Sequence, residues 1–328
     1  MKPRVLVTGA SGALGPLLVR GLVKEGYPVK AMVRRKVRPH TFPQGVTTVH
    51  GDITRKSDVM HAVADVDIVY HLAAKLHIND PGALLENEYS RTNVDGTRLI
   101  CRASADAGVT RIVYFSTISV YGSQNGYDVI DETTEPTPLT VYGMTKKAAE
   151  DIVLGLENDA QRVEGVVLRL AAVYGSRMKG NYRTLLSAVR KGWFLPVGPG
   201  LNRRTLVHES DVVRAAMVAA IHPRAAGGVF NVTDGEVHTL RGILNALYES
   251  LGKPGPRWYV PEPLARHGAR IADRVLQGAG YNGGRLETFI TKYTEDVAVS
   301  GDKFIRELAF TPLFDLRGGW KETASGVS

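Results

Sequence analysis

A single cysteine, Cys101, is present among 328 residues. One thiol excludes an intramolecular disulfide and offers no metal-ligand cluster, so we expect no metal and a reducing compartment. Long hydrophobic runs are also missing, because no segment approaches the apolar length of a membrane-spanning helix. The first apolar run belongs to a predicted strand of the fold and not to a signal peptide. Together these absences favour a cytoplasmic protein without stable membrane insertion.

Acidic residues are in the minority, with 33 Asp and Glu against 41 Lys and Arg, which leaves a formal net charge of +8. This balance suits anionic ligands such as dinucleotides and nucleotide sugars, and we expect a small-molecule substrate. Nucleic acid is the rival partner. The basic residues are spread along the chain, however, without a recognisable nucleic-acid module or a long basic tail, so we expect no binding to nucleic acid.

One stretch, Pro261–Leu276, places basic residues at helical spacing. Three arginines recur at every fourth position, and three aliphatic residues share another face: Arg266, Arg270 and Arg274, and Leu264, Ile271 and Val275. A basic amphipathic helix of this kind is able to contact an acidic membrane surface. The sequence favours the simpler interpretation, a solvated charged face on a small C-terminal lobe.

Near the N-terminus an apolar strand runs into a turn with three glycines and then into a helix predicted at Gly12–Glu25. Gly9 permits the tight turn, Gly12 lets the backbone approach phosphates, and Gly15 allows close packing of the helix. The helix N-terminus adds free N–H donors and positive partial charge. This arrangement predicts the binding site of a dinucleotide pyrophosphate.

Short apolar runs alternate with helical patterns through the first half of the chain. The predicted strands are Arg4–Val7, Val29–Val33, Val46–His50, Ile68–Leu72, Arg111–Phe115 and Val166–Leu170. Further helices are predicted at Ser57–Ala64, Leu84–Ala107 and Val141–Glu157. Alternation of this kind predicts an α/β fold, a Rossmann-type doubly wound parallel sheet covered on both faces.

After about Val173 the pattern changes, because Pro and Gly punctuate shorter elements. We expect residues 1–173 to form a dinucleotide-binding Rossmann domain and residues 174–328 to form mainly a smaller substrate-binding lobe. Segments near 205–232, with a helix at Asp211–Ile221 and a strand at Val229–Val232, are expected to return to the first domain.

Tyr142 and Lys146 lie one helical turn apart and therefore share a face of their predicted helix. The ammonium group stabilises a phenolate, which predicts a tyrosine pKa lowered toward neutrality, and an oxidised nicotinamide nearby would act in the same direction. Tyr142 is therefore a candidate acid/base, although YxxxK alone is common and a solvated surface pair is the alternative.

The glycine spacing GxxGxxG, the Tyr142–Lys146 pair and the strand end Ser116–Tyr121 together resemble the extended short-chain dehydrogenase/reductase superfamily. The resemblance is to its NAD(P)-dependent nucleotide-sugar epimerase/dehydratase family, of the UDP-glucose 4-epimerase type. It implies that Thr117 hydrogen-bonds the substrate oxygen, that Ser116 lines the cofactor, and that Ser119 is a weaker alternative for contact with substrate.

The same resemblance implies a set of cofactor contacts along the chain. Asp52 and Ile53 match the pair that meets the adenine, Leu72, Ala73 and Ala74 match the turn beneath the dinucleotide, and Asn93 matches a helix residue that orders the sheet. The full set of expected cofactor contacts is Gly9, Ser11, Gly12, Ala13, Leu14, Gly15, Arg34, Asp52, Ile53, Leu72, Ala73, Ala74, Asn93, Ser116, Tyr142 and Lys146. Taken alone, Asn93 could instead be a residue that packs a helix, and His71 could be a core histidine whose hydrogen bonds are satisfied within the protein.

The residues after Thr117 bear on the reaction. Dehydratases of the family carry Asp and Glu where this chain has Ile118 and Ser119, so dehydration is disfavoured. Oxidation or reduction at one carbon remains, transient in an epimerase or net in a ketoreductase. We expect a nucleotide-sugar 4-epimerase or 4-ketoreductase.

The residues that bear on the cofactor and on the substrate point to different functions. At the end of the second strand an acidic residue would bind the ribose of NAD, but Val33 is followed here by Arg34, which favours NADP(H) because it is able to pair with a 2′-phosphate. Arg204 matches the arginine that nucleotide-sugar enzymes place on the diphosphate. Ala172 replaces an asparagine that many of these enzymes use, which weakens the nucleotide-sugar assignment.

Two alternatives stay open. One is an NADPH-dependent ketoreductase or hydroxysteroid-type dehydrogenase acting on a non-sugar alcohol or ketone, which the Ala172 and Arg34 signals fit. The other is a non-catalytic dinucleotide-binding protein, which the intact set of Thr117, Tyr142 and Lys146 disfavours. By analogy with the superfamily we also expect a homodimer formed by the helices matching Leu84–Ala107 and Val141–Glu157.

Overall fold

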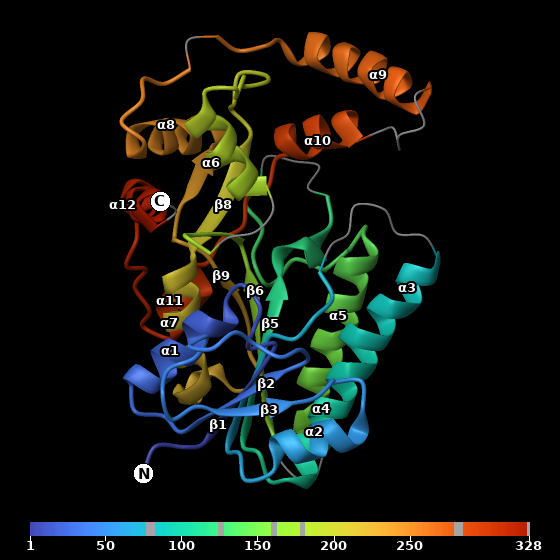
Figure 1. The fold of residues 1–328 in the computed structure, drawn as a ribbon, viewed down its shortest axis with the longest axis vertical. Coiled ribbons are helices and arrows are strands. Elements are labelled where there is room, and N and C mark those ends of the chain that lie inside the picture. Colours follow the sequence, from blue (N-terminus) through green and yellow to red (C-terminus); the bar gives the residue numbers. More distant parts are fainter. Residues whose placement is uncertain are drawn as a thin grey trace.

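The computed structural model describes residues 1–76, 83–123, 128–158, 163–177, 181–256, 258–278 and 285–326. Seven parallel strands form one sheet in the order β3-β2-β1-β4-β5-β6-β9 (Figure 1). They are β1 (Val5–Thr8), β2 (Val29–Val33), β3 (Thr47–His50), β4 (Ile68–His71), β5 (Arg111–Thr117), β6 (Glu164–Leu170) and β9 (Val229–Val232). The predicted doubly wound fold is confirmed, and the strand order reverses between β1 and β4, where such folds bind ligands.

Helices cover both faces of this sheet. Successive side chains of a strand point to opposite faces, and here the side chains on both faces are apolar. Val5 and Val7 of β1 pack on the side of α1 (Gly15–Lys24) and α7 (Glu209–Ile221). Leu6, between them, packs on the opposite side. The helices of that side are α2 (Lys56–Val63), α4 (Gly96–Asp106) and α5 (Val141–Leu154). Every residue of β1 is buried, as expected for a strand covered on both faces.

The predicted helix over Leu84–Ala107 is confirmed over nearly its whole length, but it is not regular, because it consists of three consecutive helical segments. They are α3 (Ala83–Tyr89), a π-helical turn η1 (Ser90–Asp95) and α4. Asn93 lies in the π turn, where its Oδ1 accepts a hydrogen bond of 2.7 Å from the Lys75 backbone and its Nδ2 donates to Lys75 O and Thr145 Oγ1. The widened turn thus satisfies a buried amide that a regular helix would aim elsewhere.

A smaller, three-stranded sheet follows, in the order β10-β8-β7. Its strands are β7 (Ala172–Tyr174), β8 (Arg203–His208) and β10 (Val237–Thr239). A second apolar cluster, with Tyr174, Leu206 and the fully buried Trp320 among its members, joins this sheet to its helices. These helices are α6 (Asn181–Lys191), α8 (Leu240–Ser250) and α12 (Leu316–Gly326).

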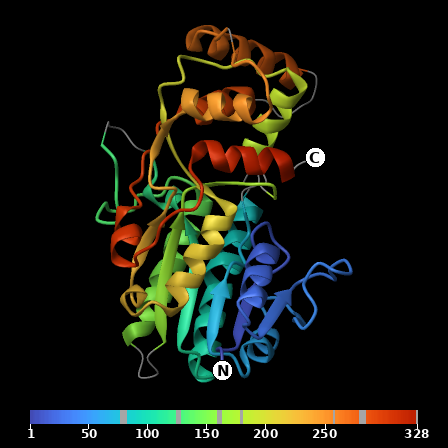
Figure 2. The same cartoon turned by 90° about the vertical axis from the view of Figure 1, so that its left-hand side faces the viewer.

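The remaining helices are α9 (Glu262–Gly278), α10 (Arg285–Thr294), α11 (Asp302–Glu307) and the short 3-10 segments η2 (Ile118–Tyr121), η3 (Gly155–Asn158) and η4 (Pro223–Ala225). In both ribbon views α9 lies at the end of the molecule opposite the N-terminus (Figures 1 and 2). The sequence favoured a solvated charged face for α9, and Arg270 and Arg274 are indeed exposed. The face is not only solvated, however, because Arg266 and Arg270 also bond to α10.

Candidate functional site

The glycine-rich turn joins β1 to α1, and its glycines are required for different reasons. Gly9 has φ +65°, and a Cβ there would lie 2.7 Å from the backbone N of Ala73. A Cβ on Gly15 would clash with the carbonyl oxygen of Ala10. Gly12 has only the carbonyl oxygen of Gly9 near its Cβ position, at 3.1 Å. These contacts confirm the predicted tight turn and the close packing of the helix.

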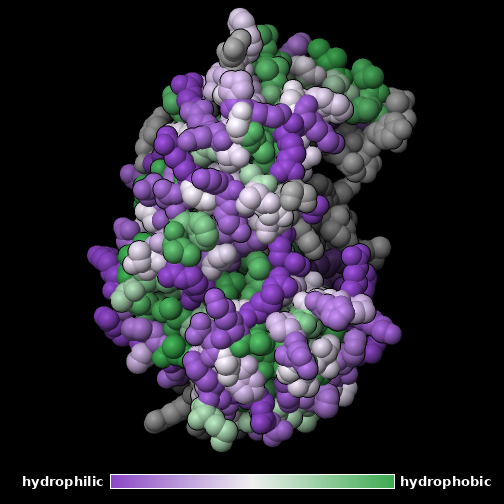
Figure 3. Space-filling model, turned by 60° about the vertical axis from the view of Figure 1, so that its left-hand side comes forward, coloured by the Kyte–Doolittle hydropathy of each residue, from purple (hydrophilic) through white to green (hydrophobic). Residues whose placement is uncertain are grey.

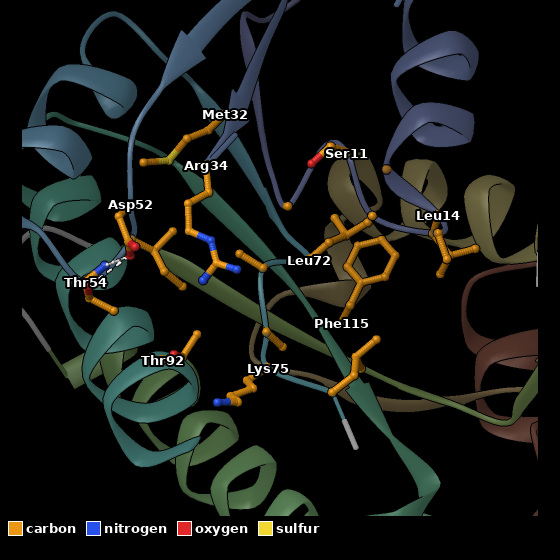
Figure 4. Close-up of a pocket in the computed structure, with 18 of the residues that line it drawn as sticks. Ser11, Leu14, Met32, Arg34, Asp52, Thr54, Leu72, Lys75, Thr92 and Phe115 are labelled. Atoms are coloured by element: carbon orange, nitrogen blue, oxygen red, sulfur yellow. Dashed lines mark hydrogen bonds between the residues drawn. The ribbon is translucent and has the colours of Figure 1, made fainter. Parts of the chain in front are cut away.

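A cavity of about 700 Å³ opens at the carboxyl edge of the large sheet (Figure 4). This volume lies within the range of roughly 300–1,000 Å³ that is typical of ligand pockets. The structure brings most of the predicted cofactor contacts together on its wall. These are Gly9, Ser11, Gly12, Ala13, Leu14, Gly15, Arg34, Asp52, Ile53, Leu72, Ala73, Ala74, Ser116, Tyr142 and Lys146. Asn93 does not line the cavity and instead holds the backbone of Lys75, which does.

Several lining residues were not predicted from the sequence: Met32, Gly51, Thr54, Lys75, Leu76, Glu88, Arg91, Thr92, Phe115 and Leu170. Most are neighbours of predicted residues at the same strand ends, so the strand pattern contained their signal. Glu88, Arg91 and Thr92 come from α3 and the π turn, where nothing in the sequence distinguishes them from ordinary surface polar residues.

At one end of the cavity Arg34 extends toward Asp52 and Leu72 (Figure 4). The Asp52 carboxylate accepts hydrogen bonds of 2.9 Å from the backbone and the hydroxyl of Thr54. Burial acts to raise the pKa of Asp52, but these hydrogen bonds and the charges of Arg34 and Arg55 outweigh it and lower the pKa. A fixed carboxylate and an exposed guanidinium therefore face the same space.

Lys146 is buried beside the cavity and donates a hydrogen bond of 2.5 Å to the carbonyl of Phe115 at the end of β5. Its ammonium group also lies 3.9 Å from the centre of the Tyr114 ring. Burial lowers the pKa of Lys146 to about 7, although the Glu150 carboxylate acts in the opposite direction. Its proton is therefore held weakly at neutral pH.

Burial, with a smaller effect of Tyr89, raises the pKa of Tyr142 to about 12. The expectation that Lys146 lowers this pKa is wrong for the protein groups alone, because Lys146 is engaged by the Phe115 carbonyl and is itself poorly solvated. Tyr142 is therefore a phenol at neutral pH, ready to donate a proton.

The two other predicted hydroxyl residues, Thr117 and Ser119, do not line the described cavity. Thr117 ends β5 and caps η2, with its Oγ1 accepting a hydrogen bond of 3.2 Å from the Ser119 backbone and donating to Ser119 Oγ. Ser119 is exposed. Thr117 is therefore the last residue of the strand that carries Ser116 to the cavity, and Ser119 follows in η2.

Arg204 lies on β8 of the small sheet, away from the residues that line the cavity. Its guanidinium donates to the carbonyls of Lys292 and Tyr293 at the end of α10, and it lies 3.9 Å from a Glu295 oxygen. The side chain is 13% exposed, so it presents little free guanidinium surface.

A buried polar network lies beneath the cavity wall, and the sequence patterns did not predict it. Glu150 of α5 accepts hydrogen bonds from Ser116 Oγ and, at 2.8 Å, from Arg169 Nη2 on β6. Arg169 Nη1 donates to the Tyr121 hydroxyl, which donates to Asn231 Oδ1. Glu150 is fully buried. The signal was Arg169 itself, because a charge inside an otherwise apolar strand requires a buried partner.

His71 is a satisfied core histidine. The Thr97 hydroxyl donates to the carbonyl of Asn93, so it accepts from His71 Nε2 at 3.0 Å. His71 Nδ1 therefore accepts from the Thr8 hydroxyl at 2.7 Å. Burial, aided by the charge of Lys146, lowers the pKa of His71 to about 3 and keeps the ring neutral. In the described ranges no group of His, Cys, Asp and Glu is arranged to hold a metal ion.

A doubly wound parallel sheet with a glycine-rich turn at the carboxyl edge, beside a cavity, defines the class of dinucleotide-binding α/β proteins. The family model described as the NAD dependent epimerase/dehydratase family matches residues 5–233. The chain belongs to this family, whose members are epimerases, dehydratases and reductases of the extended short-chain dehydrogenase/reductase type.

Relatives of the chain include an epimerase and a ketoreductase. A UDP-glucose 4-epimerase of Vibrio cholerae is 32% identical over 80% of this chain and 80% of its own. A 4-hydroxy-2-methyl-3-oxo-4-farnesyl-3,4-dihydroquinoline-1-oxide ketoreductase of Stigmatella aurantiaca is 28% identical over 94% of this chain and 91% of its own. Among solved structures, MoeE5 in complex with UDP-glucose and NAD is similar with a TM-score of 0.76 and 28% identity, covering 98% of each chain.

Proposed function

We propose that the protein transfers hydride at C4 of a nucleotide sugar, as a 4-epimerase or a 4-ketoreductase, with Tyr142 as the acid/base. The observation that carries the proposal is that Tyr142 and Lys146 line the same cavity as the glycine-rich turn. The 4-epimerase among the relatives and the UDP-glucose complex of MoeE5 support the substrate class.

The residues present fit a dinucleotide. A side chain at Gly9 or Gly15 would clash with backbone atoms. Gly12 has no side chain, so its backbone is accessible from the cavity. The backbone of Gly9–Gly15 at the start of α1 would hold the pyrophosphate, Asp52 and Ile53 would meet the adenosine, and Leu72–Ala74 would lie beneath it. The nicotinamide, when bound, supplies the hydride acceptor or donor.

The chain's own groups would move the proton. The Tyr142 hydroxyl would give its proton to the substrate oxygen in reduction and take it back in oxidation. Thr117 would orient that oxygen by a hydrogen bond. The Lys146 ammonium would hold Tyr142 and the ribose in place, and its pKa of about 7 makes its charge sensitive to pH near neutrality.

Arg34 supports a preference for NADP(H) over NAD, because its exposed guanidinium lines the cavity beside Asp52. Replacing Arg34 with alanine is expected to weaken NADPH binding by about 10- to 100-fold, the value of a charge-assisted hydrogen bond, and to leave NADH binding nearly unchanged. Fluorescence titration of both cofactors measures this. Arg35→Ala is the matched control, since Arg35 is also exposed but does not line the cavity. Equal loss for both cofactors would contradict the preference.

The nucleotide-sugar assignment is tested at Arg204, which we propose as the ligand of the diphosphate. In this role the guanidinium would exchange the carbonyls of Lys292 and Tyr293 for phosphate oxygens. We expect Arg204→Ala to weaken UDP-glucose binding by about 10- to 100-fold in isothermal titration. Arg203→Ala, which loses the ion pair with Asp296, serves as the control. Indifference of UDP-glucose binding to Arg204→Ala, or no binding to the wild type, would refute the sugar assignment.

A second candidate is a net ketoreductase or hydroxysteroid-type dehydrogenase acting on a non-sugar alcohol or ketone. The observation that favours it is that the Arg204 guanidinium is already satisfied by the chain, at 13% exposure. The farnesyl-quinoline ketoreductase among the relatives supports it. NAD released from the purified, denatured protein would favour the epimerase, whereas an empty protein that prefers NADPH would favour this reductase.

We also propose a homodimer formed through α4 and α5, which pack against each other along the edge of the molecule (Figure 1). Met144, on α5, is 51% exposed there and would be covered by a second copy. Light scattering after size exclusion measures the mass of the assembly, and a monomer at high concentration would exclude the dimer.

A further inference from the structure

Helix α9 has its polar side turned toward the protein. Arg266 donates to Glu262 Oε1 at 2.8 Å and to the hydroxyls of Thr291 and Thr294 on α10, at 2.9 and 3.0 Å. Arg270 pairs with Glu287 at 2.9 Å. The polar side of α9 is therefore the side that attaches it to α10.

Asp273 belongs to the same attachment. It is 5% exposed and accepts the backbone N–H groups of Leu286 and Glu287 at the start of α10, at 3.3 and 3.2 Å. A carboxylate at the N-terminus of a helix satisfies free N–H groups and interacts favourably with the helix dipole. The inward orientation of this side is thus fixed by several directional bonds and not by one.

The apolar side consequently faces away from the molecule. Leu264, Ile271 and Val275 recur at i, i+7 and i+11, which places them on one face, and they are 65%, 50% and 67% exposed. In Figure 3 hydrophobic side chains gather at the end of the molecule where α9 lies in Figure 1. We call Leu264, Ile271 and Val275 the outward face. Burying each would contribute roughly 1.5–3 kcal/mol, which the fold forgoes.

The charges beside the outward face have one sign. At 100° per residue, His267 and Arg274 lie about 60–80° from its centre, and both are exposed. The two acidic residues of α9, Glu262 and Asp273, lie on the opposite side and are engaged there. An apolar stripe on the outside of a helix, with an exposed arginine along one edge and no acidic residue of the helix beside it, resembles the pattern of helices that lie in a membrane interface.

We infer that the outward face of α9 docks on the surface of an anionic lipid membrane, with the helix lying flat in the interface. The size of the face argues against a protein partner, because a stable interface uses about 20–30 residues a side, whereas this face is one stripe on a helix of 17 residues. A lipid surface has no such minimum. No helix within the described ranges is long and apolar enough to cross a bilayer, and flat docking requires none.

The placement of α9 leaves the cofactor cavity open. The glycine-rich turn belongs to the half of the molecule that contains the N-terminus, and α9 lies at the other end (Figures 1 and 2). Variants of the outward face are therefore expected to bind cofactor as the wild type does. This separates failure of docking from failure of the fold or of the proposed function.

Co-sedimentation of the full chain with vesicles tests the inference. We expect binding to vesicles of phosphatidylglycerol and phosphatidylcholine in equal parts, weak binding to phosphatidylcholine alone, and weakening as salt rises. The triple variant Leu264→Ser, Ile271→Ser, Val275→Ser should lose at least about tenfold in affinity for the anionic vesicles. Arg274→Glu should reduce the difference between the two vesicle types.

A matched triple variant, Met60→Ser, Ile221→Ser, Leu313→Ser, removes three other exposed apolar side chains and should bind vesicles like the wild type. Absence of vesicle binding by the wild type, or equal binding by both triple variants, would overturn the inference. Light scattering gives one more decisive outcome. If the outward-face variant changes the oligomeric state while the wild type ignores vesicles, the face is a contact between copies and the inference is wrong.

Discussion

Replacing Tyr142 with phenylalanine is expected to lower kcat by about 10²–10⁴-fold while cofactor binding and the folded structure persist. The change removes one hydroxyl, whose pKa of about 12 makes it a proton donor at neutral pH. The ring, its burial and its place on the cavity wall all remain. Steady-state turnover, with cofactor titration and thermal unfolding on the same samples, measures the separation of chemistry from folding.

Tyr70→Phe is the matched control for this prediction. Tyr70 is fully buried in β4, and its hydroxyl has no hydrogen-bond partner in the described part of the chain. Removing an unpaired buried hydroxyl is expected to be neutral or stabilising, with unchanged turnover. Near-normal activity of the Tyr142 variant would reject Tyr142 as the acid/base, and equal loss in both variants would indicate a general effect of the substitution.

The large sheet was predictable because most of its strands are apolar runs bounded by Gly, Pro or polar residues, the polar edge strand β3 being the exception. Val29–Val33 and Val229–Val232 were located to the residue. β5 extends two residues beyond its predicted end, and β6 begins two residues before its predicted start. The sequence pattern identifies strands that are buried on both faces, because such strands lack alternating polar residues. It does not show at which residue the hydrogen bonding of a strand begins or ends.

The cofactor wall was predictable for the same reason as the sheet, because its residues follow strand ends at one edge. The π turn at Asn93 was not, because a widened turn has no periodicity of its own and depends on the Lys75 backbone 18 residues earlier. The pKa of Tyr142 was also out of reach. Spacing shows that Tyr142 and Lys146 share a helix face, but only coordinates show that Phe115 O binds the ammonium.

The orientation of α9 illustrates a related limit. Its amphipathic pattern was visible, and the usual rule turns the apolar side inward. Here the partner helix α10 presents Thr291, Thr294 and Glu287 to it, so hydrogen bonds and ion pairs decide which side packs. Periodicity identifies two faces of a helix, and the chemistry of the neighbouring element decides which of them is covered.

Glu150→Gln is expected to lower the free energy of unfolding by about 3–5 kcal/mol, because it removes one partner of a buried ion pair. The Glu150 and Arg169 side chains are 1% and 5% exposed, so water does not solvate the Arg169 charge that remains after the substitution. Glutamine keeps the volume and a bond to Ser116, which isolates the electrostatic effect. The midpoint of urea denaturation at neutral pH measures the change.

Two further variants make the prediction specific. On the same helix, Asp151→Asn breaks the Lys147–Asp151 pair, whose carboxylate is 60% exposed, and should change stability by less than about 1 kcal/mol. Adding Arg169→Met to Glu150→Gln removes the buried guanidinium that has lost its carboxylate partner, so the double variant should be more stable than Glu150→Gln alone. Wild-type stability of Glu150→Gln would mean that the network contributes no stability.

Glu150 also acts on the pKa of Lys146, and a purely structural role of Glu150 would not change the pH profile of an enzyme that uses Lys146. Its carboxylate raises the pKa of Lys146, which burial lowers to about 7. Without that charge the pKa falls further, so Lys146 loses its proton at a lower pH. If the ammonium form is the active one, the alkaline limb of the kcat profile should move to lower pH in Glu150→Gln and stay in place in Asp151→Asn. An unmoved limb would confine Glu150 to stabilising the fold and leave Lys146 independent of the network beneath it.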